Sequence, residues 1–203
     1  MPHNPFNADH RKVTQIINFF ASKSGGKINK LKALKLIFLA DRYHLRKYGR
    51  LVSGDYYVAM KLGPVPSTAM DIAELDKYLD DTYKTYAKKY IKALDKGMRV
   101  ESIRQVDVDY FSESDMEALN FAWNKFGHLQ KWSLSDFTHF YPEWKKHEDA
   151  LRSGSKVENM ELEDFFLDPD VDTVDKCYEL TEEERRLRLK HLAELIHCES
   201  LWR

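Results

Sequence analysis

Apolar residues recur every three to four positions along most of this chain, which is the spacing of one face of an α-helix. This spacing predicts helices over residues 9–22, 30–48, 68–79, 82–94, 113–126, 133–140 and 142–152, and from 182 onward. The second helix carries on one face Leu31, Leu34, Ile37, Phe38, Asp41 and Leu45. We expect the basic residues of that helix to point outward: Lys30, Lys32, Lys35, Arg42 and Arg46.

Residues that favour helix ends flank several of these segments. Asn29 is expected to cap the start of the second helix, and Ser67 the start of the third. Gly49 is expected to end the second helix, because glycine readily adopts the left-handed conformation found at helix C-termini. The segments 112–115 (SESD) and 181–184 (TEEE) have the form of capping boxes and predict two further helix starts.

Two segments have the composition of strands. Residues 56–60 are rich in aromatic and β-branched side chains, and residues 98–108 alternate apolar and polar positions. We expect the two to pair in a small antiparallel sheet of two or three strands. The Gly63-Pro64-Val65-Pro66 sequence between strand and helix is expected to form a rigid turn. Together these elements predict a predominantly α-helical α+β fold, with a single domain of packed helices and a small antiparallel β-sheet.

The sequence also indicates where this domain ends. Ser153-Gly154-Ser155 is the best linker candidate, so we expect a globular domain over 1–152, followed by an acidic arm and a C-terminal helix over 153–203. No apolar run is long enough to cross a bilayer, and no secretory signal is recognisable. Two cysteines, Cys177 and Cys198, do not make a disulfide framework. We therefore expect a cytoplasmic protein with no membrane partner.

Charge is distributed unevenly along the chain. Residues 157–184, here called the acidic arm, hold twelve acidic residues and one lysine, for a net charge of −11. Residues 1–156 carry a net charge of +7 and residues 185–203 a net charge of +3. The acids alternate with apolar residues such as Phe165 and Phe166, whereas a purely solvating tail holds few aromatic rings. The arm is thus predicted to dock onto a basic surface with an apolar floor; the alternative is a loosely packed tail.

No motif in the sequence predicts catalysis. Asp41 and His44 lie one helical turn apart, but no serine or cysteine nucleophile motif accompanies them, so a hydrogen-bonded surface pair or a buried polar contact to the next segment is favoured. Four residues late in the chain could in principle bind zinc: Cys177, His191, His197 and Cys198. The last two are adjacent on a helix and diverge by about 100°, which disfavours a metal site. We expect no enzyme activity and no cofactor.

Two groups of residues carry a family resemblance. The first runs from Lys-Leu-Ile-Phe-Leu-Ala-Asp at 35–41 through His44 and Tyr48-Gly49-Arg50 to Gly63-Pro64-Val65. The second comprises Thr138-His139, Pro142 and Trp144. In order and spacing they resemble the Panacea antitoxin domain (SocA-like, GepA phage-associated), over roughly residues 13–146.

The resemblance implies an antitoxin, usually encoded beside a small toxin that it neutralises by direct binding. One branch of the family acts as an adaptor that delivers its toxin to a protease, so that role stays open. A nucleic-acid-binding regulator that uses the basic body is a further alternative, although no helix-turn-helix is evident and direct binding of nucleic acid is disfavoured. Self-association is also left open.

The candidate site residues fall into two sets. Candidates for partner binding are Arg42, Tyr43, Arg46, Phe165, Phe166, Asp168 and Asp170. Residues that carry the resemblance and are expected to be structural are Asp41, His44, Gly49, Gly63, Pro64, Val65, Thr138, His139 and Trp144. If the toxin acts on RNA or nucleotides, its active site is basic, and the arm would place carboxylates where phosphates bind and phenyl rings where bases bind.

Overall fold

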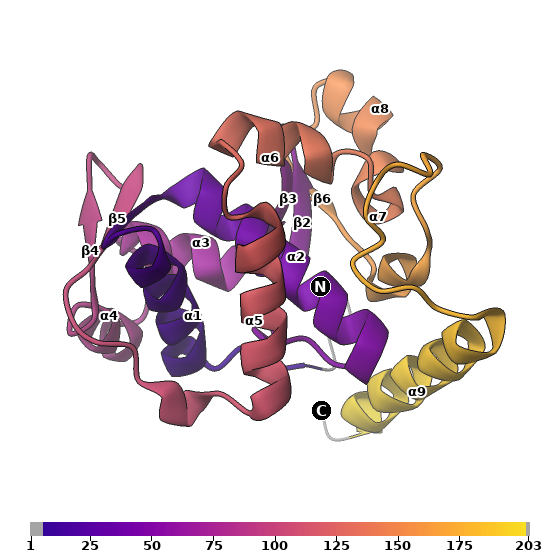
Figure 1. Ribbon diagram of the computed structural model, residues 1–203, viewed down its shortest axis with the longest axis horizontal. Helices are drawn as coiled ribbons and strands as arrows, with labels where there is room; N and C mark the ends of the chain where they lie inside the picture. The colour runs from indigo at the N-terminus through magenta and orange to yellow at the C-terminus, as the bar shows by residue number, and fades with distance from the viewer. Residues whose placement is uncertain (1–5, 202–203) are drawn as a thin grey trace.

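Figure 1 shows the computed structural model of the chain, which describes residues 6–201. Its elements are α1 (His10–Lys23), β1 (Lys27–Asn29), α2 (Lys30–Tyr48), β2 (Tyr57–Met60), β3 (Gly63–Pro66), α3 (Ser67–Glu74), α4 (Asp81–Ala87), β4 (Ile91–Leu94), β5 (Arg99–Ser102), the 3-10 helix η1 (Val108–Tyr110), α5 (Glu113–Phe126), α6 (Lys131–Thr138), α7 (Pro142–Lys145), α8 (Glu148–Arg152), β6 (Glu158–Asn159), the 3-10 helix η2 (Leu162–Phe166) and α9 (Glu182–Leu201). The predicted class, a mostly helical α+β fold, is confirmed. Within residues 6–201, no helix combines the length and hydrophobicity needed to cross a bilayer.

Helix α2 is the centre of the fold. It packs against α1, α3, α5, α6 and β3, and Figure 1 shows it running through the middle of the molecule. Every residue of α2 from Ala33 to Arg46 is buried, so the helix is covered on all sides. It ends as predicted at Gly49, which adopts φ +79° in the left-handed region.

The predicted helix caps are confirmed with one exception. Asn29 and both capping boxes form, and the second box joins Thr181 and Glu184 by hydrogen bonds in both directions. Ser67, predicted to be a cap, is instead the first residue of α3 and makes no capping bond. The buried carboxylate of Asp55 takes that role, accepting from the amides of Thr68 at 2.9 Å and Ala69 at 2.8 Å.

The strands form two sheets rather than the single sheet predicted. One has the order β1-β5-β4 and the other β3-β2-β6, all antiparallel. The prediction that residues 98–108 pair with 57–60 is therefore wrong, because β5 lies between β1 and β4. The alternation of apolar residues identifies a strand, but it does not identify the strand with which it pairs.

The Gly-Pro-Val-Pro segment is a strand and not the predicted turn. It pairs with β2 in a register that places Met60 opposite Gly63, so the turn of this hairpin consists of Lys61 and Leu62. Pro64 and Pro66 fit in β3 because it is an edge strand of its sheet, where a missing amide donor removes no ladder bond.

Three predicted helices end early or divide. Residues 82–94 form α4 only as far as Ala87, and 91–94 form β4. The helix predicted over 68–79 ends at Glu74, and the one over 142–152 divides into α7 and α8. Residues 91–94 are a strand because the turn at Asp95-Lys96-Gly97, where all three residues adopt positive φ, returns the chain to pair with β5.

The acidic arm folds onto the body and is not a loose tail. Strand β6 pairs with β2, and η2 buries Leu162, Phe165 and Phe166 in the same core as α2. Figure 1 shows the arm passing beside α7 before it reaches α9. The arm and the body therefore share one core, and the division into a 1–152 domain and a 153–203 extension stays a prediction.

Candidate functional site

Two arginines of α2 organise the contact between body and arm. Arg42 and Arg46 are one helical turn apart and thus share a face, and neither side chain is exposed. The prediction that they point to solvent, together with Lys35, is wrong. The arm covers the face that holds the arginines, while Lys35 is buried and donates to the carbonyl of Pro64 at 2.7 Å.

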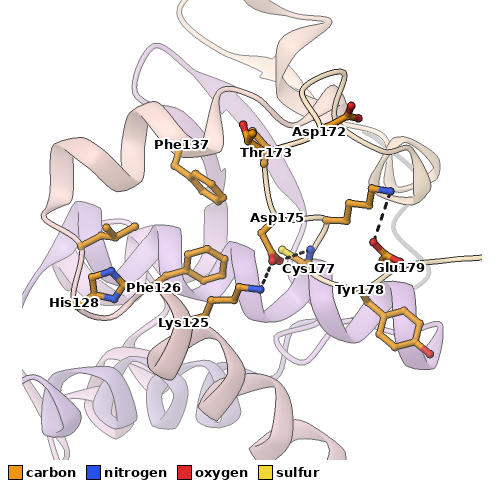
Figure 2. A pocket seen from close by; sticks show the side chains of 13 residues that line it. Lys125, Phe126, His128, Phe137, Asp172, Thr173, Asp175, Cys177, Tyr178 and Glu179 are labelled. Atoms are coloured by element: carbon orange, nitrogen blue, oxygen red, sulfur yellow. Dashed lines mark hydrogen bonds and ion pairs between the residues drawn. The ribbon is translucent and has the colours of Figure 1, made fainter.

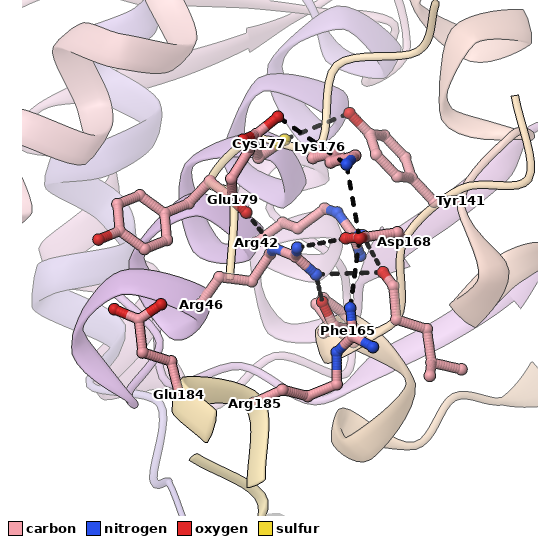
Figure 3. Close-up of polar contacts among 12 residues, drawn as sticks. Arg42, Arg46, Tyr141, Phe165, Asp168, Lys176, Cys177, Glu179, Glu184 and Arg185 are labelled. Atoms are coloured by element: carbon pink, nitrogen blue, oxygen red, sulfur yellow. Dashed lines mark hydrogen bonds and ion pairs between the residues drawn. The ribbon is translucent and has the colours of Figure 1, made fainter. Parts of the chain in front are cut away.

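Arg46 binds four residues of the arm. Its Nε donates to the carbonyl of Tyr178 at 2.7 Å, and its Nη1 donates to the carbonyls of Phe165 at 3.0 Å and Leu167 at 3.1 Å (Figure 3). Its Nη2 donates to Asp168 Oδ1 at 2.6 Å. The fan of donors of one guanidinium thereby ties together residues that lie up to thirteen positions apart in sequence.

Arg42 forms a buried ion pair with Glu143 of α7, and both side chains are fully buried. Its Nη2 also donates to the carbonyl of Leu167 at 2.7 Å, and its guanidinium lies 4.3 Å from the ring centre of Tyr141. Burial raises the pKa of Glu143 above its ordinary value, and the nearby Arg42 opposes that shift. Arg42 therefore joins α2 to α7 and to the arm at one point.

The aromatic residues proposed as partner anchors are part of the core. Phe165 and Phe166 have no exposed surface, and the Phe165 ring packs edge-on against Phe38 at 5.6 Å between centroids. Tyr43 is also buried and stacks on Phe121. In this folded state these side chains are not accessible to a partner, and their assignment to a partner-binding role stays an untested prediction.

The two aspartates in the candidate set lie differently. Asp168 is partly buried among Arg46, Arg185 at 3.2 Å and Lys176 at 3.7 Å. Burial raises its pKa, but the hydrogen bond from Arg46 and the nearby cations outweigh this and hold the pKa of Asp168 below its ordinary value. Asp170 is exposed and pairs with Lys145 at 3.2 Å.

The arm has an apolar inner side and an acidic outer side. Eight of its twelve acids are exposed: Glu161, Glu163, Asp170, Asp172, Glu179, Glu182, Glu183 and Glu184. The remaining four are partly buried, and several of them pair with lysines or arginines of the body or of α9. The arm thus presents a fixed acidic surface to solvent.

A cavity of about 620 Å³ lies between the arm and the ends of α5 and α6 (Figure 2). Lys125 crosses its edge to pair with Asp175, and Cys177 lies beside them. Burial raises the pKa of the Cys177 thiol to about 12, so the thiol is protonated at neutral pH. Among the side chains that the structure describes, no three of His, Cys, Asp or Glu are close enough to hold a metal ion.

The residues of the Gly-Pro-Val motif meet α6 at close range. Gly63 has φ +99°, and a Cβ on it would lie 2.7 Å from Thr138 Oγ1 and 2.9 Å from Lys35 Nζ. Thr138 itself is fixed by donating to the carbonyl of Ser135 at 2.8 Å. Buried Val65 lies within the same hairpin. Glycine is therefore required at position 63 both by backbone conformation and by space.

The other motif residues close the core through polar contacts. Trp144 is buried, donates from Nε1 to the carbonyl of Met60 at 2.9 Å, and stacks on His139. Asp41 accepts from the amide of Ser53 at 2.9 Å and from the hydroxyl of Tyr57 at 2.7 Å. The bonds to Met60 and Tyr57 join α7 and α2 to strand β2.

Asp41 and His44 do not contact each other. His44 Nδ1 donates to the carbonyl of Arg50 at 2.8 Å, and Nε2 accepts from Ser114 Oγ at 3.0 Å. Each member of the pair is thus a buried polar contact to the following segment, which was one of the two structural interpretations. Both ring nitrogens of His44 are therefore engaged in hydrogen bonds.

Sequence reasoning missed the inward orientation of the α2 cations and the role of Glu143. A signal was present, because Phe38, Arg42 and Arg46 are spaced by four residues and so continue one stripe of the helix. Arginines on the same helix face as a buried phenylalanine indicate that this face is covered by another segment. An acidic segment elsewhere in the chain is suited to cover it. Glu143 gave no comparable signal, since its neighbours in sequence are those of an ordinary first helical turn.

Comparison with known proteins gives one match. A family model described as the antitoxin SocA-like Panacea domain matches residues 34–145, slightly more than half of the chain. No curated protein and no solved structure matches significantly. The matched region begins in α2 and ends in α7, and it contains the hairpin of β2 and β3 and the Thr138 to Trp144 segment that packs on it. The chain therefore belongs to the SocA-like Panacea antitoxin domain family.

Proposed function

We propose that this protein is a cytoplasmic antitoxin that neutralises a partner toxin by direct protein–protein contact. Family membership supports the antitoxin role. The observation that supports the mode of contact is the orientation of the acidic arm, whose apolar residues face the body and whose exposed acids face solvent. A surface of this kind is complementary to a basic face on the toxin.

Fixation of the arm favours binding by a preformed surface. Arg42 and Arg46 hold the arm at the carbonyls of Phe165, Leu167 and Tyr178, so its acids are displayed in one arrangement before a partner arrives. A preformed surface loses less conformational entropy on binding than a flexible tail does. The exposed Leu167 and Val171 add apolar contact area among the acids.

Binding rather than catalysis is supported by the state of the reactive side chains. Both nitrogens of His44 are engaged, and burial lowers the pKa of His44 to about 4. The thiol of Cys177 is buried and protonated at neutral pH. A pKa near 4 makes His44 a weak general base at neutral pH, and a buried protonated thiol is a poor nucleophile.

The test is neutralisation by a charge-reversed arm. The product of the neighbouring reading frame is co-expressed with Glu163→Lys/Asp170→Lys/Asp172→Lys, and the affinity of the purified complex is measured. We expect the arm variant to bind at least about tenfold more weakly and to lose growth rescue. Its affinity should also depend less on salt concentration than that of wild type. The matched control reverses three exposed acids of the body, Asp109→Lys/Asp136→Lys/Asp149→Lys, and should bind within about twofold of wild type.

The same experiment separates the alternatives. Wild-type binding by the arm variant would exclude the acidic surface as the contact. Failure of the wild-type chain to bind or neutralise the neighbouring product would contradict the antitoxin proposal itself. Toxin abundance distinguishes blocking from delivery, because a blocked toxin persists in cells whereas a toxin delivered to a protease disappears when the antitoxin is present.

A further inference from the structure

An apolar groove of about 780 Å³ lies at the N-terminal end of α2, away from the contact between the arm and Arg46. It is bounded by the start of α2, the hairpin turn of β2 and β3, the start of α6, and the segment that leads into β6. The groove at Leu34 and the arm contact at Arg46 are separated by twelve residues of α2, or roughly 18 Å along the helix axis. The two surfaces are therefore distinct.

The floor of the groove is apolar and adaptable. It is lined by Leu31, Leu34, Met60, Leu62, Val65, Met70, Met98 and Trp132. Three of these side chains are exposed well beyond what a closed core allows: Leu62 at 44%, Met98 at 53% and Trp132 at 55%. Methionine is flexible and polarisable, so a floor that contains three of them can adjust to the side chains of a ligand.

The rim of the groove is basic. Four lysines line it, Lys30, Lys61, Lys131 and Lys156, and no acidic residue does. Lys30 is paired with Glu74, whereas among the described residues the other three form no ion pair. The rim therefore carries uncompensated positive charge above an apolar floor, and the ligand that complements both is acidic on one side and apolar on the other.

We propose that this groove binds an acidic amphipathic segment of the partner toxin, with its apolar side chains on the floor and its carboxylates against Lys61, Lys131 and Lys156. This inference rests on the antitoxin role proposed above. An amphipathic helix laid in such a groove presents apolar anchors every three or four residues. Because the arm is acidic and the groove rim is basic, the two contacts have opposite polarity, which fixes the orientation of the toxin on the body.

The acidic arm of a second copy does not meet this requirement. Its aromatic residues Phe165 and Phe166 are buried in its own core, and its outer side is mainly acidic. It therefore offers carboxylates to the rim but few apolar groups to the floor. The occupant is expected to be another protein.

The first test uses a designed peptide as the probe. A peptide of about twenty residues made of Leu, Glu and Ala, with leucines at helical i, i+3, i+4 and i+7 spacing, is titrated into the full chain. Binding is followed in methyl spectra of the methionines. We expect Met60, Met70 and Met98 to shift, while Met116 and Met160, which do not line the groove, serve as internal references.

Two control peptides test the two halves of the argument. One has the same composition in an order that scatters the leucines around the helix, and the other replaces each Glu by Lys. Both are expected to bind at least about tenfold more weakly. Equal binding of the scattered peptide, or shifts of Met116 and Met160 as large as those of the groove methionines, would overturn the proposal. Shifts that depend on protein concentration without peptide, together with a doubled mass, would assign the groove to a second copy and also overturn it.

Groove variants connect the probe to the toxin. Lys61→Glu/Lys131→Glu/Lys156→Glu should weaken peptide binding and toxin affinity at least about tenfold. The control with the same net charge, Lys88→Glu/Lys89→Glu/Lys92→Glu, changes exposed lysines away from the groove and should leave both within about twofold. A groove variant that loses the peptide but binds toxin normally would refute the groove as a toxin contact and leave the antitoxin proposal intact. A wild-type chain that binds the peptide but no toxin would refute the antitoxin role instead.

Discussion

Charged side chains in the interior of α2 are satisfied mainly by backbone carbonyls of other segments. Lys35 donates to Pro64, Arg42 to Leu167, and Arg46 to three carbonyls of the arm. Burying a charge is costly unless hydrogen bonds replace water, and removal of one partner leaves the other charge uncompensated. These residues therefore specify which segment must lie on which face of the helix, rather than adding a large net stability.

His44 is expected to remain neutral well into the acid range. Burial is the main cause that lowers its pKa from 6.5 to about 4, and the charge of Arg50 adds to the effect. Between these two values the unfolded chain binds more protons than the folded one, so the stability contribution is complete above pH 6.5 and is lost as pH falls toward 4. The shift corresponds to about 3 kcal/mol.

The measurement combines an NMR titration of the His44 ring with urea unfolding at pH 7 and pH 4.5. Asp55 acts in the opposite direction, because burial raises its pKa to about 6 and the folded chain then binds more protons than the unfolded chain below that pH. The free energy of unfolding of wild type minus that of His44→Gln isolates the contribution of the histidine, because the variant lacks this titrating group. We expect that difference to be smaller at pH 4.5 than at pH 7. A ring that titrates near pH 6.5 would contradict the assignment.

At the scale of elements, the hairpin of β2 and β3 depends on one glycine. Gly63→Ala should destabilise the fold by about 3 kcal/mol, because the new methyl group combines positive-φ strain with a clash against Thr138 and Lys35. Gly154→Ala is the matched control, since Gly154 has φ +113° but open space around its Cβ position. We expect about 1 kcal/mol for the control. Equal losses in urea unfolding would show that the close packing at Gly63 has no energetic role.

Helices, and most helix ends, could be predicted from the sequence because their signals are local. The stripe of α2, the stop at Gly49 and the capping box at Ser112 each occupy a few consecutive turns. Strand partners could not be predicted in this way. Residues 99–102 join β1 and β4 rather than β2 because pairing depends on contacts between distant segments, about which alternation carries no information.

One missed element did have a local signal. The sequence Leu94-Asp95-Lys96-Gly97 contains the turn between β4 and β5, and Asp and Gly in such positions favour the positive φ values observed. This turn signal indicates that residues just before Asp95 belong to a hairpin rather than to a helix over 82–94. For the candidate site, the acidic and aromatic character of the arm was evident, but its inward-facing phenylalanines could be located only once Phe38 and Tyr57 were seen to pack on Phe165.

At the scale of the whole molecule, the body should depend on the arm. A chain that ends at Gly154 lacks β6, Phe165 and Phe166, uncovers the face of α2 that holds Arg46, and removes the carbonyl partners of Arg46. We expect it to lose at least about 5 kcal/mol of stability and with it cooperative thermal unfolding. A chain that ends at residue 180 keeps β6, η2 and the partners of Arg46 and loses α9 with the last four residues of the arm, so its loss should be smaller.

A point substitution checks the same dependence without truncation. Arg46→Ala should cost about 3–5 kcal/mol, because the carbonyls of Phe165 and Tyr178 lose their donor in the interior and Asp168 loses its nearest cation. Arg186→Ala changes an exposed arginine and should be nearly neutral. If the chain ending at Gly154 unfolds cooperatively at the wild-type temperature, residues 1–152 are a domain in their own right and the shared core is dispensable.

The late position of η2 in the sequence has a consequence for synthesis of the protein. Domains generally fold during translation from the N-terminal side. In this protein, however, the central helix α2 packs against side chains and donates to carbonyls that are synthesised after residue 157. A nascent chain interrupted before that point exposes Phe38 and leaves Arg46 without its partners, and so resembles a misfolded substrate for proteases. Interrupted translation would therefore yield no partly active protein. Only completed chains would contribute to the amount of active protein in the cell.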